Sequence, residues 1–123
     1  MADTVLNESI LNSIKKLLGI NTSDIVFDQD IAIHINTVFA NLVQMGIGPS
    51  NGYMITSENN EWKEFCGDDL PLLNNVKTYV YLKVKLVFDP PSSSFVIESI
   101  NKTLDKLEWR LNSAYETGKE ANS

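Results

Sequence analysis

The feature of the sequence that most constrains the fold is a helical repeat directly after a proline pair. Asp89-Pro90-Pro91 must end the element before it, because proline restricts its own backbone and that of the preceding residue. Further along, apolar residues recur at alternating spacings of three and four: Ile97, Ile100, Leu104, Leu107 and Leu111. This pattern predicts a helix that follows an N-cap at Ser92, Ser93 or Ser94 and ends near Asn112. About two heptads suffice for a packed helix in a bundle and are too few for a coiled coil.

Two further amphipathic helices are expected in the N-terminal half of the chain. Apolar residues follow helical spacing over residues 6–18, and Gly19 should end that helix. A second helix should run from near Asp28 to Gly46. The carboxylates of Asp28 and Asp30 are well placed at its N-terminus, where the helix dipole favours negative charge.

Residues 47–57 break this helical pattern. Glycine, proline and asparagine are dense there, and a short β-prone segment follows. We expect a loop or small hairpin that projects from the helical body. A short helix over residues 61–65 should come next, capped by Asn59 or Asn60 and closed by Gly67.

Residues 73–88 fit two patterns. In one, apolar residues alternate with others as in a half-buried strand: Val80, Leu82, Val84 and Leu86. In the other, apolar residues share one face of a helix: Leu73, Val76, Val80, Val84 and Val87. The run is longer than a typical strand, which slightly favours the helix. Periodicity alone leaves both possibilities open.

Composition indicates a single globular domain. Hydrophobic residues make up 43% and charged residues 21% of the 123 residues, which is ordinary for a folded domain. No apolar run reaches the roughly 18–20 residues of a membrane-spanning helix, so no membrane is expected among the partners. The N-terminus has no basic region leading into an apolar segment, and one cysteine cannot form an internal disulfide. We therefore expect a protein made in the cytoplasm.

The formal net charge of −6 is unevenly distributed. Residues 1–75 hold ten acids and three bases, whereas residues 76–123 hold six acids and seven bases. DNA-binding domains normally carry a basic stripe, because neutralisation of phosphates supplies much of their affinity. The charge balance therefore argues against sequence-specific DNA binding. Its simplest explanation is the solubility of a small domain.

No catalytic, cofactor or metal motif is recognisable. His34, the only histidine, lies between two isoleucines of an expected helix, and no nucleophile stands at a recognisable spacing from it. Cys66 is expected to be a small buried hydrophobe. The acidic residues Glu64, Asp68 and Asp69 lack the regular spacing of a calcium loop. We expect no enzyme activity and no cofactor.

Two tryptophans are the main candidates for contacts with a partner, since tryptophan is enriched at interface hot spots. Trp62 lies in the short helix beside the glycine-rich loop. Trp109 stands between Leu107 and Leu111, so it points away from the apolar seam and covers either a neighbouring element or a partner. Substitution of either tryptophan is expected to spare folding and impair assembly. The remaining candidate interface residues are Tyr53, Tyr81 and Arg110.

Several motifs in the C-terminal half occur in a distinctive combination. An aromatic-rich segment, Val76–Phe88, precedes the proline break, and the chain continues with Ser93-Ser94-Phe95-Val96 and the ending Leu107-Glu108-Trp109-Arg110-Leu111-Asn112. In this combination the stretch resembles the phage head–tail connector (head-completion adaptor) family of long-tailed phages. Similarity extends upstream, and the resemblance covers residues 18–112; the upstream segments are Phe27–Ile31, Gln44–Pro49, Gly52-Tyr53 and Glu61-Trp62.

The resemblance implies a mainly α-helical fold. It would be a small helical bundle of four to five helices with a projecting loop or short β-hairpin near residues 47–57. Residues 73–88 would then be helical. Residues 1–115 are expected to form a single helical connector domain, and the polar composition of residues 116–123, not the resemblance, predicts a flexible tail.

The resemblance also implies a structural virion protein at the head–tail interface, made in the host cytoplasm. Copies would form a ring of about twelve subunits that docks on the portal protein and extends the DNA channel. The tail or a second head-completion protein would bind below, and packaged DNA would pass through without sequence-specific binding. The alternative is a monomeric helical adaptor or regulatory module that binds a single phage or host protein.

Overall fold

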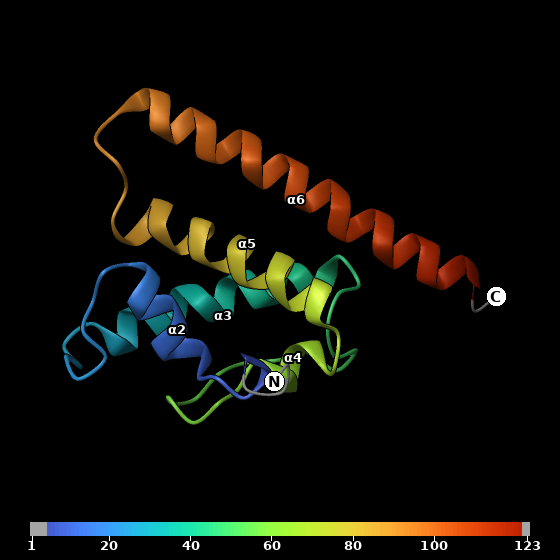
Figure 1. The fold of residues 1–123 in the computed structure, drawn as a ribbon, viewed down its shortest axis with the longest axis horizontal. Coiled ribbons are helices and arrows are strands. Elements are labelled where there is room, and N and C mark those ends of the chain that lie inside the picture. Colours follow the sequence, from blue (N-terminus) through green and yellow to red (C-terminus); the bar gives the residue numbers. More distant parts are fainter. Residues whose placement is uncertain (1–4, 122–123) are drawn as a thin grey trace.

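The computed structural model describes the backbone of residues 5–121 and the side chains of residues 5–113. Its helices are α2 (Ile10–Leu17), α3 (Asp28–Gln44), α4 (Lys63–Cys66), α5 (Leu70–Phe88) and α6 (Ser94–Ala121) (Figure 1). Within residues 5–121, β-pairing is limited to one isolated antiparallel bridge between Ser9 and Glu61. The expected mainly α-helical bundle is confirmed.

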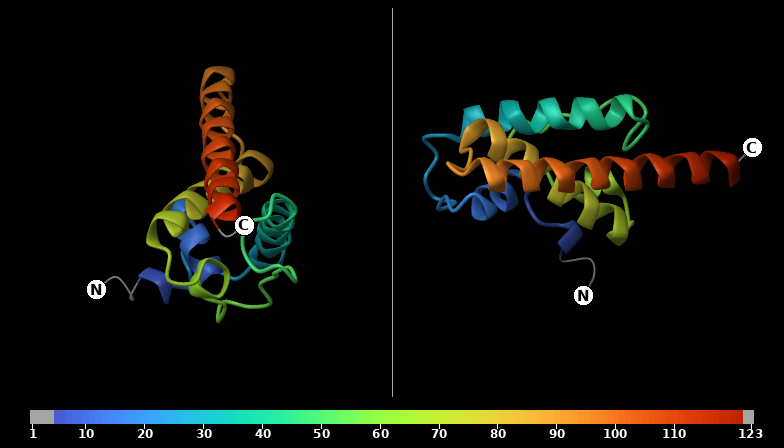
Figure 2. Two further views of the ribbon diagram at one scale, coloured as in Figure 1. Left: turned by 90° about the vertical axis from the view of Figure 1, so that its right-hand side faces the viewer. Right: turned by 90° about the horizontal axis from the view of Figure 1, so that it is seen from above.

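Helix α5 is the central element of the bundle. It packs against α2, α3 and α4 on one side and against α6 on the other. The proline pair reverses the chain, so α6 runs antiparallel to α5 and extends past the body at its C-terminal end, as the view from above in Figure 2 also shows.

The double-sided packing of α5 explains the two patterns of residues 73–88. Asp69 caps the helix, because its carboxylate accepts a hydrogen bond from the Leu72 backbone N–H at 3.0 Å. A helix with neighbours on both sides needs a wide apolar surface, and that width also produces the alternation typical of a strand. The segment is helical, as the resemblance implies. Its buried residues are Leu73, Val76, Tyr79, Val80 and Val84.

Helix α6 begins where the serines predict. The Ser93 hydroxyl accepts a hydrogen bond from the Val96 backbone N–H at 3.4 Å, so Ser93 acts as the N-cap. The predicted apolar seam faces α5, with Leu104, Leu107 and Leu111 buried and Ile100 partly buried.

The end of α6 lies beyond the prediction. The helix continues past Asn112 to Ala121: neither proline nor glycine occurs from Ser94 to Thr117, and the helix also passes through Gly118. The predicted end near Asn112 rested on the polar composition of the residues that follow it, and not on a helix-breaking residue. The predicted tail at 116–123 thus lies partly within α6, and its last two positions are outside the described residues.

Helix α2 is shorter than the predicted span of residues 6–18. It begins at Ile10 because Ser9 acts as its N-cap and accepts a hydrogen bond from the Asn12 backbone N–H at 3.2 Å. Leu6 is buried all the same, so the apolar pattern before Ser9 reflects core packing outside this helix.

The turn before α4 is closed by Asn60, which does not cap that helix as expected. Its Oδ1 accepts hydrogen bonds from the backbone N–H groups of Thr56, at 2.7 Å, and Ser57, at 3.2 Å. The donor at the start of the helix is satisfied instead by Glu64, which accepts a hydrogen bond from the Glu61 N–H at 3.0 Å. The predicted asparagine cap is wrong because that side chain is already engaged by the turn.

Residues 47–57 form an irregular loop that is held against the body. Ile47 and Ile55 are buried, and Asn36 of α3 makes two hydrogen bonds, of 2.8 and 3.1 Å, with the Ile55 backbone. Gly48 has a φ of +88°, and a Cβ atom there would collide with the ring of Phe65. Of the two predicted forms, the loop does not pair as a hairpin, because packing of its isoleucines on the core overrides its β-prone composition.

Trp62 is a core residue, which corrects the expectation that it anchors a partner. Its side chain has 0% exposure. The indole Nε1–H donates to the Ser13 Oγ of α2 at 3.1 Å, and the ring lies edge-on to Phe39 of α3, with centroids 6.3 Å apart. Its backbone N–H donates to the Glu8 carbonyl at 3.2 Å. Substitution of Trp62 therefore cannot spare folding.

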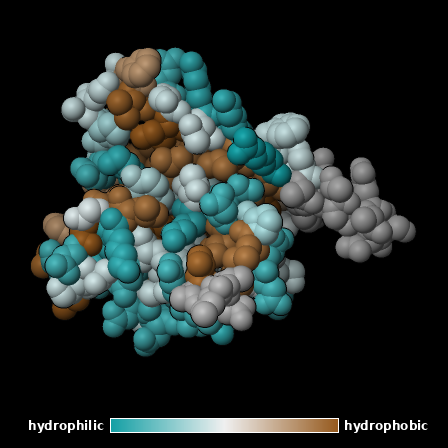
Figure 3. All heavy atoms as spheres, viewed as in Figure 1, coloured by the Kyte–Doolittle hydropathy of each residue, from teal (hydrophilic) through white to brown (hydrophobic). Residues whose placement is uncertain are grey.

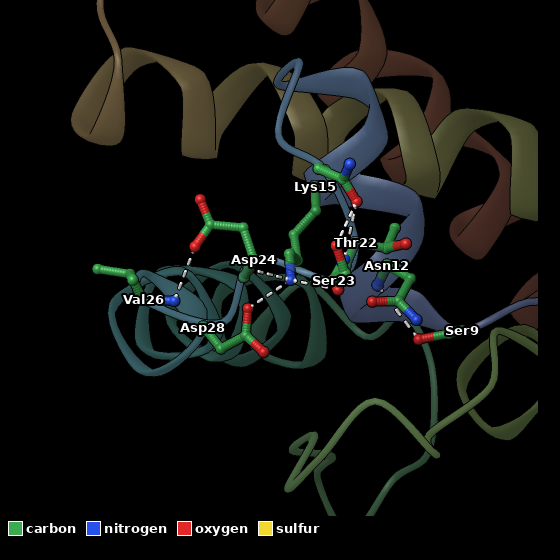
Figure 4. Close-up of polar contacts among 9 residues, drawn as sticks. Ser9, Asn12, Lys15, Thr22, Ser23, Asp24, Val26 and Asp28 are labelled. Carbon is green, nitrogen blue, oxygen red and sulfur yellow. Dashed lines mark hydrogen bonds and ion pairs between the residues drawn. The ribbon is translucent and has the colours of Figure 1, made fainter.

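Lys15 joins the end of α2 to the start of α3 and has no exposed surface (Figure 4). Its ammonium donates to the backbone carbonyls of Thr22, at 3.1 Å, and Asp24, at 2.7 Å. It also forms an ion pair with Asp28 of α3, with an Nζ–Oδ1 distance of 2.7 Å. The buried ammonium thus has two carbonyl acceptors and one carboxylate partner, and these contacts fix the loop between the two helices.

We predict that Trp62→Ala lowers the free energy of unfolding by about 3–5 kcal/mol, because it leaves a large cavity and removes the N–H that donates to the Ser13 hydroxyl. Trp62→Phe should cost less, since it keeps most of the apolar contact. Urea denaturation measures both values. Trp109→Ala, at an exposed position, is the matched control and should leave the midpoint unchanged; an equal loss from both tryptophans would contradict the assignment of Trp62 to the core.

We also predict that Asp28→Ala destabilises the fold by roughly 3–5 kcal/mol, because it leaves the Lys15 ammonium buried without its counter-charge. Lys15→Met should cost less, roughly 1–3 kcal/mol, since methionine fills the site and the freed carboxylate is partly hydrated. Thermal unfolding of both variants, with exposed Lys16→Met as control, gives the order. A larger loss of stability from Lys15→Met than from Asp28→Ala would contradict the view that the unpaired, buried ammonium is the main cost.

Candidate interaction surfaces

The described residues contain no group of three or more histidine, cysteine, aspartate or glutamate side chains placed to hold a metal ion. Burial, with a smaller contribution from Asp69, raises the pKa of the Cys66 thiol to about 12. Such a thiol stays protonated and unreactive at neutral pH, so the prediction of a small buried hydrophobe is confirmed. None of the described helices is long and apolar enough to cross a lipid bilayer.

Two acids of the cluster at residues 64–69 have structural roles. Glu64 accepts hydrogen bonds from the Asn60 Nδ2 at 2.9 Å, the Tyr53 hydroxyl at 2.8 Å and the Glu61 N–H. The bond from Asn60 is the main cause of a lowered pKa at this carboxyl, so Glu64 remains ionised. Asp69 caps α5, and Asp68 is exposed.

Tyr53, a candidate interface residue, is half-buried beside α3. Its ring lies edge-on to Phe39 and Phe65, with centroids 5.2 and 5.7 Å apart. Burial, and then the hydrogen bond to Glu64, raise the pKa of its hydroxyl, which therefore acts as a donor. Tyr53 borders an open groove of about 720 Å³, whose other lining residues are Asn36, Ala40, Val43, Asn51, Gly52 and Met54.

The candidates on α5 and α6 differ in accessibility. Tyr81 of α5 is half-buried and packs against the core. Trp109 of α6 is 71% exposed, and Arg110 beside it is also exposed, because Leu107 and Leu111 occupy the inward face. Within the part of the chain whose side chains are described, Trp109 covers no neighbouring element. The alternative in which Trp109 covers a neighbouring element is therefore wrong for these residues, and its contact with a partner stays a prediction.

A polar contact fixes the rotation of α6 on α5. The Tyr79 hydroxyl of α5 donates to Glu108 Oε1 of α6 at 2.7 Å, and Lys83 lies 3.9 Å from the same oxygen. Burial, followed by the bond to Glu108, raises the pKa of Tyr79, so the phenol keeps the proton that it donates. Because Glu108 is turned toward α5, the adjacent Trp109 must face outward.

The structure does not gather the five predicted residues into one site. Trp62 is internal, Tyr53 borders the groove at α3, Tyr81 lies on α5, and only Trp109 and Arg110 are neighbours on one exposed face. Sequence reasoning missed other exposed apolar residues, and the most exposed of these are Ile25, Val26, Ile33, Met54, Val87 and Phe95. Polar residues divide the apolar surface visible in Figure 3 into separate patches.

One of the missed patches lies in the loop that Lys15 fixes. Ile25 and Val26 are 73% and 76% exposed, and Phe27 is edge-on to Phe88 at the end of α5, with ring centroids 5.4 Å apart. The signal in the sequence was three consecutive apolar residues between two helices. It was missed because such a run normally indicates core, and only the fold shows that this loop faces outward.

Comparison with known families decides among the possible classes of helical protein. The model of the family described as "Phage connector protein" matches residues 10–118. The chain belongs to the phage connector family. No curated protein and no solved structure matches it. The match covers every helix from α2 to α5 and most of α6, and the connector family is structural rather than enzymatic.

For this phage connector protein we predict that the contact between Tyr79 and Glu108 stabilises the docked α6. Tyr79→Phe should lower the free energy of unfolding by roughly 1–3 kcal/mol, because it removes a hydrogen bond to a carboxylate. Adding Glu108→Gln should then cost little more, since the two groups act as one pair. Urea denaturation of the two single variants and the double variant tests this coupling. Fully additive losses would contradict it.

Proposed function

We propose that this protein is a structural virion subunit that forms a ring between the portal and the tail. The ring would contain about twelve copies and extend the channel through which DNA leaves the head. Its partners would be the portal protein on one side and the tail or a second head-completion protein on the other. The protein would be made in the host cytoplasm, function in the virion and catalyse no reaction.

The observation that carries this proposal is membership of the phage connector family over residues 10–118. The family implies a structural virion component in contact with other virion proteins. The helical bundle supports the same function, since the described residues hold no grouping of side chains for metal chemistry and the one cysteine is buried.

The exposed face of α6 supports the assembly of several copies. A closed ring requires heterologous contacts, in which one patch of a subunit meets a different patch of its neighbour. Trp109 and Arg110 are of the residue types enriched at interface hot spots, and both are exposed. The main packing contact of α6 is with α5, so the side of α6 that faces away from α5 is open to a neighbouring copy.

The net charge of −6 supports a channel that does not retain DNA. A wall of net negative charge repels phosphates, releases few counterions and so binds DNA weakly. DNA would then slide through the ring without sequence-specific contacts.

The proposal is tested in virions of the phage that encodes the protein. Quantitative immunoblotting and electron microscopy of purified particles should find several copies per DNA-filled head, located at the vertex that carries the tail. A monomeric adaptor or regulatory module would be absent from purified virions, and that result would contradict the proposal.

We predict that Trp109→Ala reduces the number of tailed, infectious particles by about tenfold or more. Each copy in the proposed ring carries the same indole, so its loss weakens the contact that each copy makes. Its unfolding midpoint should equal that of the original protein. Leu17→Ala, at an exposed apolar residue of α2, is the control and should leave particle number unchanged. Normal yields from folded Trp109→Ala protein would remove Trp109 from the interface.

A further inference from the structure

The outer face of α6, opposite the seam that packs on α5, combines aromatic and basic side chains. At 100° per residue, Phe95, Lys102, Lys106 and Trp109 point in nearly the same direction, with Arg110 beside them. Phe95 is 78%, Lys102 73% and Trp109 71% exposed. These five residues are named the outer face of α6.

Three acids of α6 have described side chains, and two of them, Glu98 and Asp105, lie on the same side of the helix as Trp109. Glu108 is turned inward to Tyr79 and Lys83. Glu98 pairs with Lys102 at 3.8 Å along the edge. Lys106 and Arg110 form no ion pair with any residue whose side chain is described. The outer face therefore presents basic groups available to an acidic partner.

An acidic surface lies on the other side of the same molecule. Residues 58–69 hold five acids and one base, and they include α4, which lies across the body from α6 in Figure 1 and in the left view of Figure 2. Glu58, Glu64, Asp68 and Asp69 are exposed. Hydrogen bonds from Asn60 and the Glu61 N–H hold the Glu64 carboxylate in place, and the Leu72 N–H holds that of Asp69. We name residues 58–69 the acidic segment.

We propose that the outer face of α6 in one copy docks on the acidic segment of the next copy. The two surfaces are opposite in charge and lie on opposite sides of one subunit, so each copy can use both at once. Two identical faces would repel each other, which leaves a heterologous, head-to-tail contact. Phe95 and Trp109 would supply the apolar anchors at either end of the basic stripe. This inference rests on the proposed function as a ring.

Charge complementarity favours a second copy over DNA as the occupant. Three bases beside two acids, Glu98 and Asp105, neutralise few phosphates, and the chain as a whole carries −6. The acidic segment of a neighbouring copy, with five acids and one base, is opposite in charge to the three bases of this face.

A charge swap tests the contact. Lys106→Glu and Asp68→Lys change exposed residues with no ion-pair partner among the described side chains. Each should reduce the copies of the protein per virion by about tenfold, because each sets like charges against each other. The double variant Lys106→Glu/Asp68→Lys should restore incorporation, because the pair is re-formed with its signs exchanged.

The control is Lys16→Glu/Asp68→Lys, which has the same net charge as the double variant but alters an exposed lysine of α2 outside both surfaces. It should not restore incorporation. Urea denaturation of each variant confirms that it folds. Equal rescue by both double variants, or rescue by neither, would overturn the inference. Anisotropy with a fluorescent DNA duplex completes the test: DNA binding that Lys106→Glu abolishes and Asp68→Lys leaves intact would assign the face to DNA instead.

The same virion measurement separates this inference from the proposed function. Original protein that is absent from virions contradicts both. Protein that is present in virions, and whose incorporation neither charge reversal reduces, contradicts the contact between α6 and the acidic segment and leaves the ring intact.

Discussion

The burial of the Trp62 indole is the interaction on which the rest of the structure depends. Its Nε1–H donates to Ser13, 49 positions away in the sequence, and the Ser13 hydroxyl donates in turn to the Ser9 carbonyl at 2.6 Å. The ring also meets Phe39 of α3. Helices of eight and four residues, such as α2 and α4, are not stable alone in water. Trp62 lies directly before α4, so its indole ties that short helix to α2 through Ser13 and to α3 through Phe39.

A second level of the structure builds on that core. Helix α5 is held from one side by the N-terminal helices and offers its other side to α6. The seam of α6 and the contact between Tyr79 and Glu108 set the rotation of α6. The side chains on the opposite face of α6 are then exposed and can contact other molecules. The proposed ring contact is therefore a consequence of how α6 docks, since the same helix rotated by a third of a turn would present a different set of charges.

Much of the fold could be predicted from local signals. The N-cap at Ser93, the break at Asp89-Pro90-Pro91 and the span of α3 follow from rules that involve neighbours along the chain. Prediction failed where a side chain had a competing partner. Asn60 closes a turn instead of capping α4, and the loop at 47–57 is held by Asn36, a residue from another element. The candidate interface was predicted only in part. Trp109 and Arg110 are exposed, whereas Trp62, which residue type alone makes as good an interface candidate as Trp109, is buried.

The sequence by itself determined that the chain is a small helical domain with a proline break, a final amphipathic helix and no recognisable catalytic motif. These properties depend on spacing and composition, which are local. Only the tertiary structure decided that residues 73–88 are a helix buried on two sides, and that of two tryptophans one is core and the other surface. Burial is set by contacts between segments far apart in the chain, and periodicity along one segment carries no information about which of its faces another segment will cover.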